Sequence, residues 1–205
     1  MEKVKKNNRV VYVGVNDRAV DLFEGMYVVP NGVSYNSYII FGGKTAVMDT
    51  VDHRFSAEWL ANIKKAVFAA DSRPDYLVVS HMEADPSGSI AEFMRIFPDV
   101  KIVGNSKTFV MLAEYFPELD AEKTPERFIT VKDGDTLDLG DGELKFIFAP
   151  MVHWPEVMVE FDTADGTLYS ADGFGKFGAL DCDEPWDDEA RRYYIGIVGK
   201  YGAQV

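Results

Sequence analysis

The sequence places three side chains that can bind a metal ion, His81, Glu83 and Asp85, at alternate positions after a short apolar run. Residues 77–79 read Leu-Val-Val, and such a short, β-branched run predicts a strand that is buried on both faces. If the backbone stays extended beyond the strand, alternate side chains point to the same side. One imidazole and two carboxylates suit a divalent metal ion, whose charge would also offset the repulsion between the acids. The alternative interpretation is a polar loop in which all three side chains face water.

Two further strand-like runs are each followed by a potential ligand. His153 comes after the run 143–148 and stands between two prolines, which would hold it in a fixed, non-helical loop. Asp172 comes after the run 167–169 and is followed by glycines, which allow another group to approach closely. Taken alone, a histidine or an aspartate at such a position is more often structural.

Five groups from three strand ends are a stronger signal than any one of them. Two imidazoles and three carboxylates could hold a pair of divalent ions, with Asp172 best placed to bridge them: His81, Glu83, Asp85, His153 and Asp172. Two such ions would leave the site weakly cationic, so that it would attract a small anion or a ligand derived from dioxygen. The remaining histidine, His53, precedes a predicted helix and is interpreted as a surface or capping residue rather than a ligand.

Composition limits the classes of function that need to be considered. The 205 residues are 47% hydrophobic and contain no long Pro/Ser/Gly stretch, which predicts one well-filled domain. The net charge of -13 argues against nucleic acid and anionic membrane surfaces as partners, because both bind basic faces. Cys182 is the single cysteine, which excludes an internal disulfide and favours a reducing, cytoplasmic location. Residues 1–6 are basic, but the apolar run 10–15 is too short for a signal peptide, and no run is long enough to span a membrane.

The order of the predicted elements indicates an α+β fold. Period-2 and β-branched runs predict strands at 10–15, 26–29, 35–41, 44–49, 77–79, 100–103, 128–131, 136–139, 143–148, 157–161 and 167–170. Apolar spacing of three and four residues predicts helices at 56–70, 89–97, 106–116 and 187–198. Two blocks of β structure with helices between and after them suggest two sheets that face each other, with helices outside.

The sequence also resembles a known family over nearly its whole length and in order. It is similar to the metallo-β-lactamase-like domain of the flavodiiron proteins, also called A-type flavoproteins. The matching stretches are YNSYII at 35–40, VMDTV at 47–51, SHMEADPSGS at 80–89, PMVHWP at 150–155, YSADGFG at 169–175 and RYYIGIVGKYGAQV at 192–205.

This resemblance implies a fold, a cofactor and an activity. The fold would be a four-layer αββα sandwich, and the cofactor a non-haem diiron centre that reduces dioxygen to water, nitric oxide to nitrous oxide, or both. One iron would be held by His81, Glu83, His153 and Asp172, and the other by Asp85 and the bridging Asp172. The zinc hydrolases of this fold carry a histidine at the position of Glu83, so the ligand set here is richer in oxygen, which favours iron.

Three departures from the family pattern concern the second iron. The family has a further histidine beyond the tyrosine-rich helix, in a C-terminal strand and helix unit that we expect to be missing here. Pro86 stands where the family often has a histidine, and Glu24 stands in a pocket loop where a histidine is common. Residues 1–205 would then form one metallo-β-lactamase-like diiron domain that is incomplete at its C-terminus.

The resemblance also implies partners. Family members carry a flavodoxin domain that binds FMN and works in a head-to-tail dimer, but this sequence contains no phosphate-binding loop of the kind that would cradle FMN. We therefore expect a flavodoxin-like domain or rubredoxin as electron donor, FMN only through a partner domain or chain, and a homodimer or a complex with the missing C-terminal portion.

Three other hypotheses remain open from the sequence. The domain could bind O2 reversibly as a diiron sensor module, or act as a zinc-dependent hydrolase of the same fold in which a metal-bound hydroxide attacks a substrate. It could also be a folded fragment of a longer protein with a half-built site. Zinc content would indicate the hydrolase, and turnover with a reduced flavin donor would separate the enzyme from the sensor.

Overall fold

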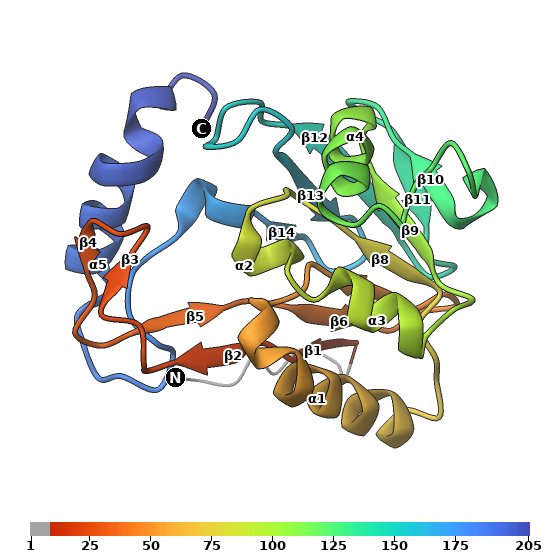
Figure 1. The fold of residues 1–205 in the computed structure, drawn as a ribbon, viewed down its shortest axis with the longest axis horizontal. Coiled ribbons are helices and arrows are strands. Elements are labelled where there is room, and N and C mark those ends of the chain that lie inside the picture. Colours follow the sequence, from red (N-terminus) through yellow and green to blue (C-terminus); the bar gives the residue numbers. More distant parts are fainter. Residues whose placement is uncertain (1–8) are drawn as a thin grey trace.

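Two β-sheets lie face to face in the computed structural model, which describes residues 9–205 (Figure 1). The basic residues 1–6, considered above in relation to a signal peptide, lie outside the described residues. The larger sheet has the strand order β1 (Val10–Tyr12), β6 (Tyr38–Ile40), β7 (Ala46–Met48), β8 (Tyr76–Val78), β9 (Lys101–Gly104) and β10 (Phe128–Thr130). Its first three strands are antiparallel to one another, whereas β7 to β10 run parallel.

The second sheet is antiparallel throughout. Its order is β11 (Thr136–Asp138), β12 (Glu143–Phe148), β13 (Met158–Asp162) and β14 (Thr167–Tyr169). Two short ladders complete the β structure, β2 (Val15–Asp17) with β5 (Val33–Tyr35), and β3 (Leu22–Phe23) with β4 (Tyr27–Val28).

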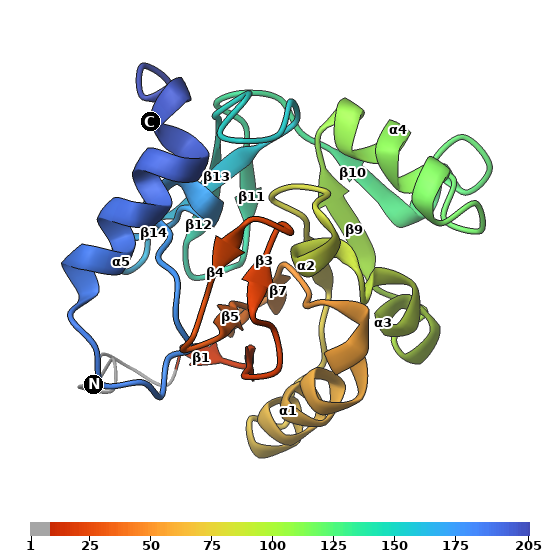
Figure 2. The same ribbon diagram turned by 60° about the vertical axis from the view of Figure 1, so that its left-hand side comes forward.

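Helices cover the face of the larger sheet that points away from the second sheet. They are α1 (Ser56–Ala69), α2 (Ala84–Ser87), α3 (Ile90–Ile96) and α4 (Ser106–Tyr115). Figure 2 shows α1, α3 and α4 on one side of this sheet and β11 to β14 on the other. In the described residues no helix is both long enough and apolar enough to cross a bilayer.

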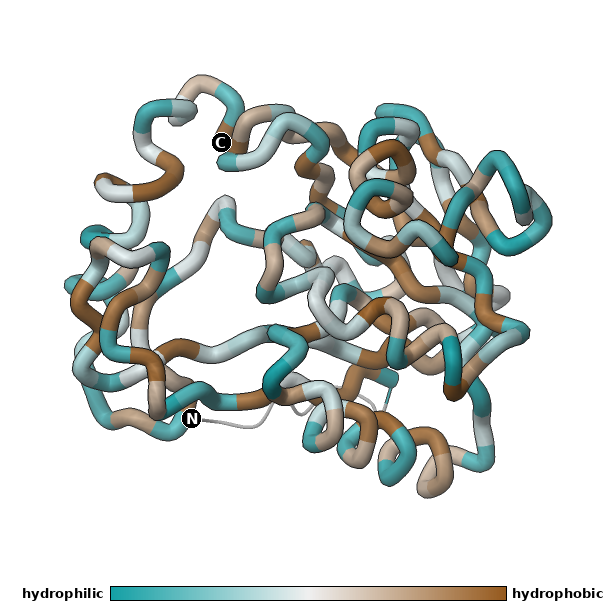
Figure 3. The backbone as a smooth tube through the Cα atoms, in the orientation of Figure 1, coloured by the Kyte–Doolittle hydropathy of each residue, from teal (hydrophilic) through white to brown (hydrophobic). Residues whose placement is uncertain are grey.

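The alternation of side chains along the strands produces two cores. In the central strands, Ile39, Val47 and Leu77 face the helices, while Ile40, Met48 and Val78 pack against the second sheet. Both faces are buried, which explains why these strands read as continuous apolar runs. Along α1, by contrast, apolar and polar residues alternate with helical spacing (Figure 3). The layers of helix, sheet and sheet are three of the four layers expected of a metallo-β-lactamase-like αββα sandwich.

The predicted first strand, 10–15, is divided between two ladders. The backbone amides of Val13 and Gly14 both donate to the carbonyl oxygen of Ser37, so the chain bulges there and continues as β2. A Cβ atom at Gly14 would clash with the carbonyl oxygen of Tyr35. Glycine therefore permits the close approach at which the chain passes from the larger sheet to the β2–β5 ladder.

The predicted helix 187–198 is also divided. The α-helix α5 (Trp186–Tyr193) continues as one π-helical stretch, Tyr194–Val198, and then a 3₁₀ turn, Gly199–Tyr201. The hydroxyl of Tyr27 donates to the carbonyl oxygen of Gly196 at 2.8 Å, and a Cβ atom at Gly196 would lie only 2.7 Å from the Tyr27 ring. The hairpin β3–β4 thus packs directly on the π-helical stretch.

The core between the two sheets should dominate stability. Phe146 in β12 is fully buried there, whereas Phe68 on α1 is 88% exposed. We expect Phe146→Ala to lower the free energy of unfolding by about 3–5 kcal/mol, because it removes a buried ring and leaves a cavity. The matched change Phe68→Ala should stay within about 0.5 kcal/mol of the parent protein. Urea unfolding of both variants measures this, and equal losses would contradict the assignment of the core.

Candidate metal centre

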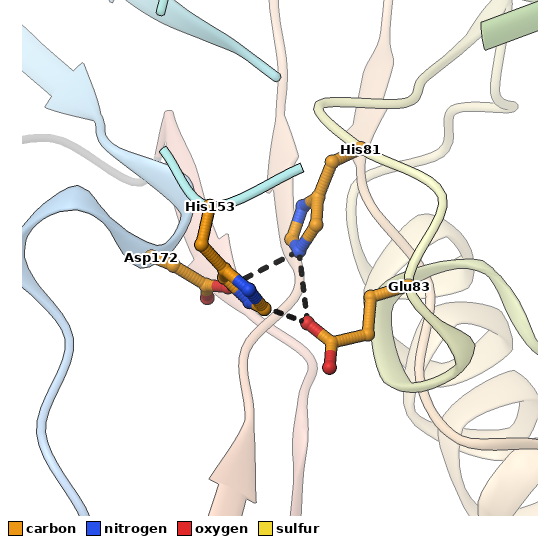
Figure 4. A group of neighbouring side chains, drawn as sticks. All are labelled: His81, Glu83, His153 and Asp172. Carbon is orange, nitrogen blue, oxygen red and sulfur yellow. Dashed lines mark hydrogen bonds and ion pairs between the residues drawn. The ribbon is translucent and has the colours of Figure 1, made fainter. Parts of the chain in front are cut away.

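Four of the five predicted ligands converge from three segments of the chain at one edge of the two sheets (Figure 4). His81 follows β8, and Glu83 stands immediately before α2. His153 lies in the connection between β12 and β13, and Asp172 lies in the 3₁₀ turn Ala171–Phe174 after β14. Each side chain offers one ligand atom, and these four atoms all lie within 4.8 Å of one another.

The two carboxylates and two imidazoles face each other in pairs. The Nε2 atom of His153 is 2.9 Å from Oε2 of Glu83 and 3.0 Å from Oδ2 of Asp172. The Nε2 atom of His81 is 3.2 Å from Oδ2 of Asp172 and 3.6 Å from Oε2 of Glu83. Two nitrogen and two oxygen donors therefore surround one small volume, which is the arrangement that a first-row divalent metal requires.

His81 supports a metal site most directly. Its side chain is almost completely buried, and among residues 9–205 neither of its ring nitrogens makes a hydrogen bond. A buried polar atom without a partner costs free energy that native proteins rarely accept. The Nε2 atom points at the carboxylates of Glu83 and Asp172 (Figure 4), so a metal ion bound among them would satisfy it. The residues present thus fit a bound metal.

Asp85 is the predicted ligand that lies outside the four-residue group. The prediction assumed an extended backbone from His81 to Asp85, and this assumption is wrong, because the chain turns into α2 at Ala84. Asp85 therefore sits in the first turn of a helix. It remains close to the group, since burial and then the charges of Glu83 and Asp172 raise the pKa of Asp85 well above its usual value.

The titration behaviour of the group follows from its mixed charges. Burial by itself lowers the pKa of His153, but its hydrogen bonds to Asp172 and Glu83 outweigh this and raise the pKa to about 9. Burial also lowers the pKa of His81, but the neighbouring acids, with Asp172 the strongest of them, together raise it above the usual value. Burial would raise the pKa of Asp172, but the charged imidazoles hold it below its usual value. Without a metal, the imidazolium groups therefore balance the carboxylates.

Buried acids that were not assigned from the sequence hold the loop around His81 by hydrogen bonds. The amide of Met82 donates to Oε1 of Glu156 at 2.8 Å, and the amide of Ser80 donates to Oδ1 of Asp49 at 2.7 Å. The Ser80 hydroxyl donates to Glu160, which is fully buried in β13. These contacts fix the backbone on either side of His81. For Glu160 the sequence signal was an acidic residue inside an apolar strand pattern.

Two more side chains line the group. Tyr193 lies in the helix predicted at 187–198, and its pKa is raised well above the usual value by burial and then by the charges of Asp172, Asp85 and Glu83. Its hydroxyl therefore faces the carboxylates. Glu24 approaches from the β3–β4 turn, with Oε1 4.0 Å from Nε2 of His153. The pKa of Glu24 is raised, first by burial and then by the charge of Glu83.

His53 lies away from the group. Its side chain is 77% exposed and contacts Asp52, which caps the 3₁₀ turn His53–Phe55. This placement agrees with the interpretation of His53 as a surface residue.

Comparisons with known proteins identify similar sequences and folds. A family model described as "ODP family beta lactamase" matches residues 33–194. The whole chain aligns with the anaerobic nitric oxide reductase flavorubredoxin of Klebsiella pneumoniae at 37% identity, and covers 43% of that protein. The flavorubredoxin homolog of Escherichia coli O157:H7 is also 37% identical, and the chain covers 50% of it.

Two solved structures of similar proteins have the same fold as this chain. The rubredoxin oxygen:oxidoreductase of Desulfovibrio gigas superposes with a TM-score of 0.87 at 29% identity, over 98% of this chain and 50% of that one. The flavodiiron protein of Giardia intestinalis gives a TM-score of 0.84 at 29% identity, over 98% of this chain and 49% of that one. The chain thus spans about half the length of the relatives that it matches.

Metal binding to the metal-free protein should release protons at neutral pH. A metal ion binds neutral imidazole, whereas the pKa of His153 is raised to about 9, so that His153 is charged at pH 7, and the pKa of His81 is raised as well. The apparent affinity for Mn²⁺ should therefore rise with pH, by about tenfold per pH unit for each proton displaced. Isothermal titration calorimetry between about pH 6 and pH 8, in two buffers of different ionisation enthalpy, counts these protons. An affinity that does not change with pH would rule out displacement of imidazolium protons.

Proposed function

Because this chain belongs to the ODP family of β-lactamase-fold domains, we propose that it is the metal-binding domain of a flavodiiron-type oxidoreductase that reduces nitric oxide or dioxygen. The resemblance to nitric oxide reductase flavorubredoxins and to a rubredoxin oxygen:oxidoreductase supports this assignment. The observation that carries it is the convergence of His81, Glu83, His153 and Asp172 within 4.8 Å.

The donor set suits iron better than zinc. Two carboxylates and two imidazoles make half of the group oxygen, and hard or borderline metals prefer such a mixture. A carboxylate at position 83, where the zinc hydrolases of this fold have an imidazole, favours the redox enzyme over a hydrolase. Bound iron would supply electrons and open coordination positions for O2 or NO.

We propose that Asp85 and Asp172 would hold a second iron beside the first. Asp85 is close enough to Glu83 and Asp172 for their charges to raise its pKa. Two like charges in a buried volume favour either a shared proton or a cation between them. Pro86, in place of the histidine that the family often has here, leaves this second position with fewer protein donors.

The chain's own residues also prepare the site for reduction chemistry, which consumes protons. The hydroxyl of Tyr193 lies against Asp172 in a buried position and stays protonated, since its pKa is raised. Tyr193 could therefore hold a proton next to the position that O2 or NO would occupy at the metal centre. Burial of His81 and Tyr193 also keeps bulk water away from this side of the site.

Electrons must come from outside the described residues. We propose a flavodoxin-like domain with FMN, or rubredoxin, as the donor, because the names of the relatives include flavorubredoxin and rubredoxin oxygen:oxidoreductase. The relatives are about twice as long as this chain, so such a domain could occupy the remaining length or a second subunit of a homodimer. A reducing, cytoplasmic environment suits both the donor and the single cysteine.

Iron content tests the ligand assignment. His81→Ala or Asp172→Ala should reduce bound iron to less than about one equivalent per chain, because each removes a donor from the four-residue group. His53→Ala should leave iron content unchanged, which makes it the matched histidine control. Iron and zinc are quantified on protein purified without added metal. Full iron loading of His81→Ala would show that the assignment is wrong.

Consumption of the gases tests the activity. With a reduced flavin or rubredoxin donor, the iron-loaded protein should consume NO or O2, and His81→Ala should consume neither above the rate of the donor alone. Purification with zinc and no gas consumption would instead indicate the hydrolase. Reversible O2 binding without turnover would indicate the sensor module.

A further inference from the structure

Glu24 brings another carboxylate to the metal centre from a segment that supplies none of the four converging donors. It lies in the turn between β3 (Leu22–Phe23) and β4 (Tyr27–Val28). Its Oε1 atom is 4.0 Å from Nε2 of His153, and 29% of its side chain is exposed. Glu24 thus reaches inward from the surface to the edge of the four-residue group.

The position of Glu24 is set by packing of the hairpin that carries it. The rings of Phe23 and Tyr27 contact Phe177, with centroids 5.8 Å and 5.4 Å away. The hydroxyl of Tyr27 donates to the carbonyl oxygen of Gly196, and Arg192 donates to that of Val28 at 2.7 Å. The turn is therefore tied to the C-terminal helix through β4, while the β3 residue Phe23 packs on Phe177.

The distance from Glu24 to His153 allows both to bind one ion. Bonds from a first-row metal to imidazole nitrogen or carboxylate oxygen are about 2.0–2.2 Å, so two donors on one ion lie no more than about 4.4 Å apart. The Oε1 atom of Glu24 and Nε2 of His153 meet this limit at 4.0 Å. Glu24 lies just outside the four atoms that fall within 4.8 Å of one another, so a movement of its side chain toward them would complete the donor set.

The charges around Glu24 also favour a cation. The groups that face it are the carboxylates of Glu83 and Asp172 and the imidazole of His153. Its backbone adopts φ 49°, a conformation that a residue with a Cβ rarely adopts. A carboxylate held beside two others by a strained turn is unfavourable unless a positive ion lies between them. The buried Nε2 atom of His81, which makes no hydrogen bond within residues 9–205, points to the same volume.

We propose that Glu24 supplies a fifth protein ligand, a carboxylate oxygen, to the metal ion held by His81, Glu83, His153 and Asp172. This inference rests on the metal-binding part of the proposed function. With Glu24 the ion has three oxygen and two nitrogen donors, which strengthens the preference for iron or manganese over zinc. The β3–β4 hairpin is then a part of the metal site and couples it to the C-terminal helix.

Titration of the metal-free protein with Mn²⁺ tests the proposal. We expect Glu24→Gln to weaken Mn²⁺ binding by at least about tenfold, since a neutral amide replaces a charged ligand. The matched control is Glu114→Gln, which alters an exposed glutamate on α4 that has no ion pair within residues 9–205, and it should bind like the parent protein. The visible spectrum of bound Co²⁺ should also change in Glu24→Gln, because the number of ligands falls.

Thermal unfolding separates a ligand from a residue that only supports the fold. Without metal, Glu24→Gln should keep or raise the Tm, because it removes the repulsion between Glu24 and its neighbouring carboxylates. The increase in Tm on adding Mn²⁺ should be smaller than in the parent protein. A purely structural role would instead lower the Tm both with and without metal, and this result would overturn the proposal.

Comparison with His81→Ala separates a failure of the Glu24 assignment from a failure of the proposed metal-binding function. If Glu24→Gln binds Mn²⁺ with the parent affinity and gives the parent Co²⁺ spectrum while His81→Ala loses binding, the Glu24 assignment fails and the proposed function stands. If His81→Ala also binds as the parent does, both assignments fail. Weakened binding in both variants, with Glu114→Gln unaffected, supports Glu24 as a ligand.

Discussion

Mutual repulsion among carboxylates in a partly buried pocket is the constraint that shapes this protein. The carboxylates of Glu83 and Asp172 lie within 4.8 Å of the two imidazoles. Burial and the charges of these carboxylates raise the pKa values of Asp85 and Glu24. Such acids cannot all be ionised in a low-dielectric volume without positive charge among them. In the metal-free protein the imidazolium groups of His81 and His153 supply it, and a divalent cation would do so more strongly.

The sandwich makes this pocket possible because it brings strand ends from both sheets to one edge. His81 and Glu83 come from the end of the parallel strand β8, while His153 and Asp172 follow strands of the antiparallel sheet. The ends of buried strands are rigid, so short loops after them can hold side chains in place. The cost is that polar groups such as Glu156 and Glu160 must be buried behind the ligand loop to bind its backbone amide and hydroxyl groups.

Two residues beside the metal centre depart from the pattern that the resemblance implies. Pro86 lies within the short helix α2 and offers no donor, whereas Glu24 offers a carboxylate from the β3–β4 turn. An imidazole exchanged for a carboxylate alters both the charge and the hardness of the donor set. The pocket of this protein is therefore more anionic than the family pattern implies, which raises its demand for cationic charge without altering the fold that supports it.

The sequence by itself determined most of the strands, the longer helices and the candidate metal ligands. Buried strands read as apolar runs and helices as three- and four-residue spacing, so the positions of His81, His153 and Asp172 at strand ends follow from local patterns alone. Only the tertiary structure decided which of these residues meet, because convergence depends on contacts between segments about 70 to 90 residues apart. It also placed Asp85 on a helix and directed Tyr193 and Glu24 to the pocket. Local patterns could not show this, since a tyrosine on an apolar helix face and a glutamate in a turn have ordinary local roles until packing brings them together.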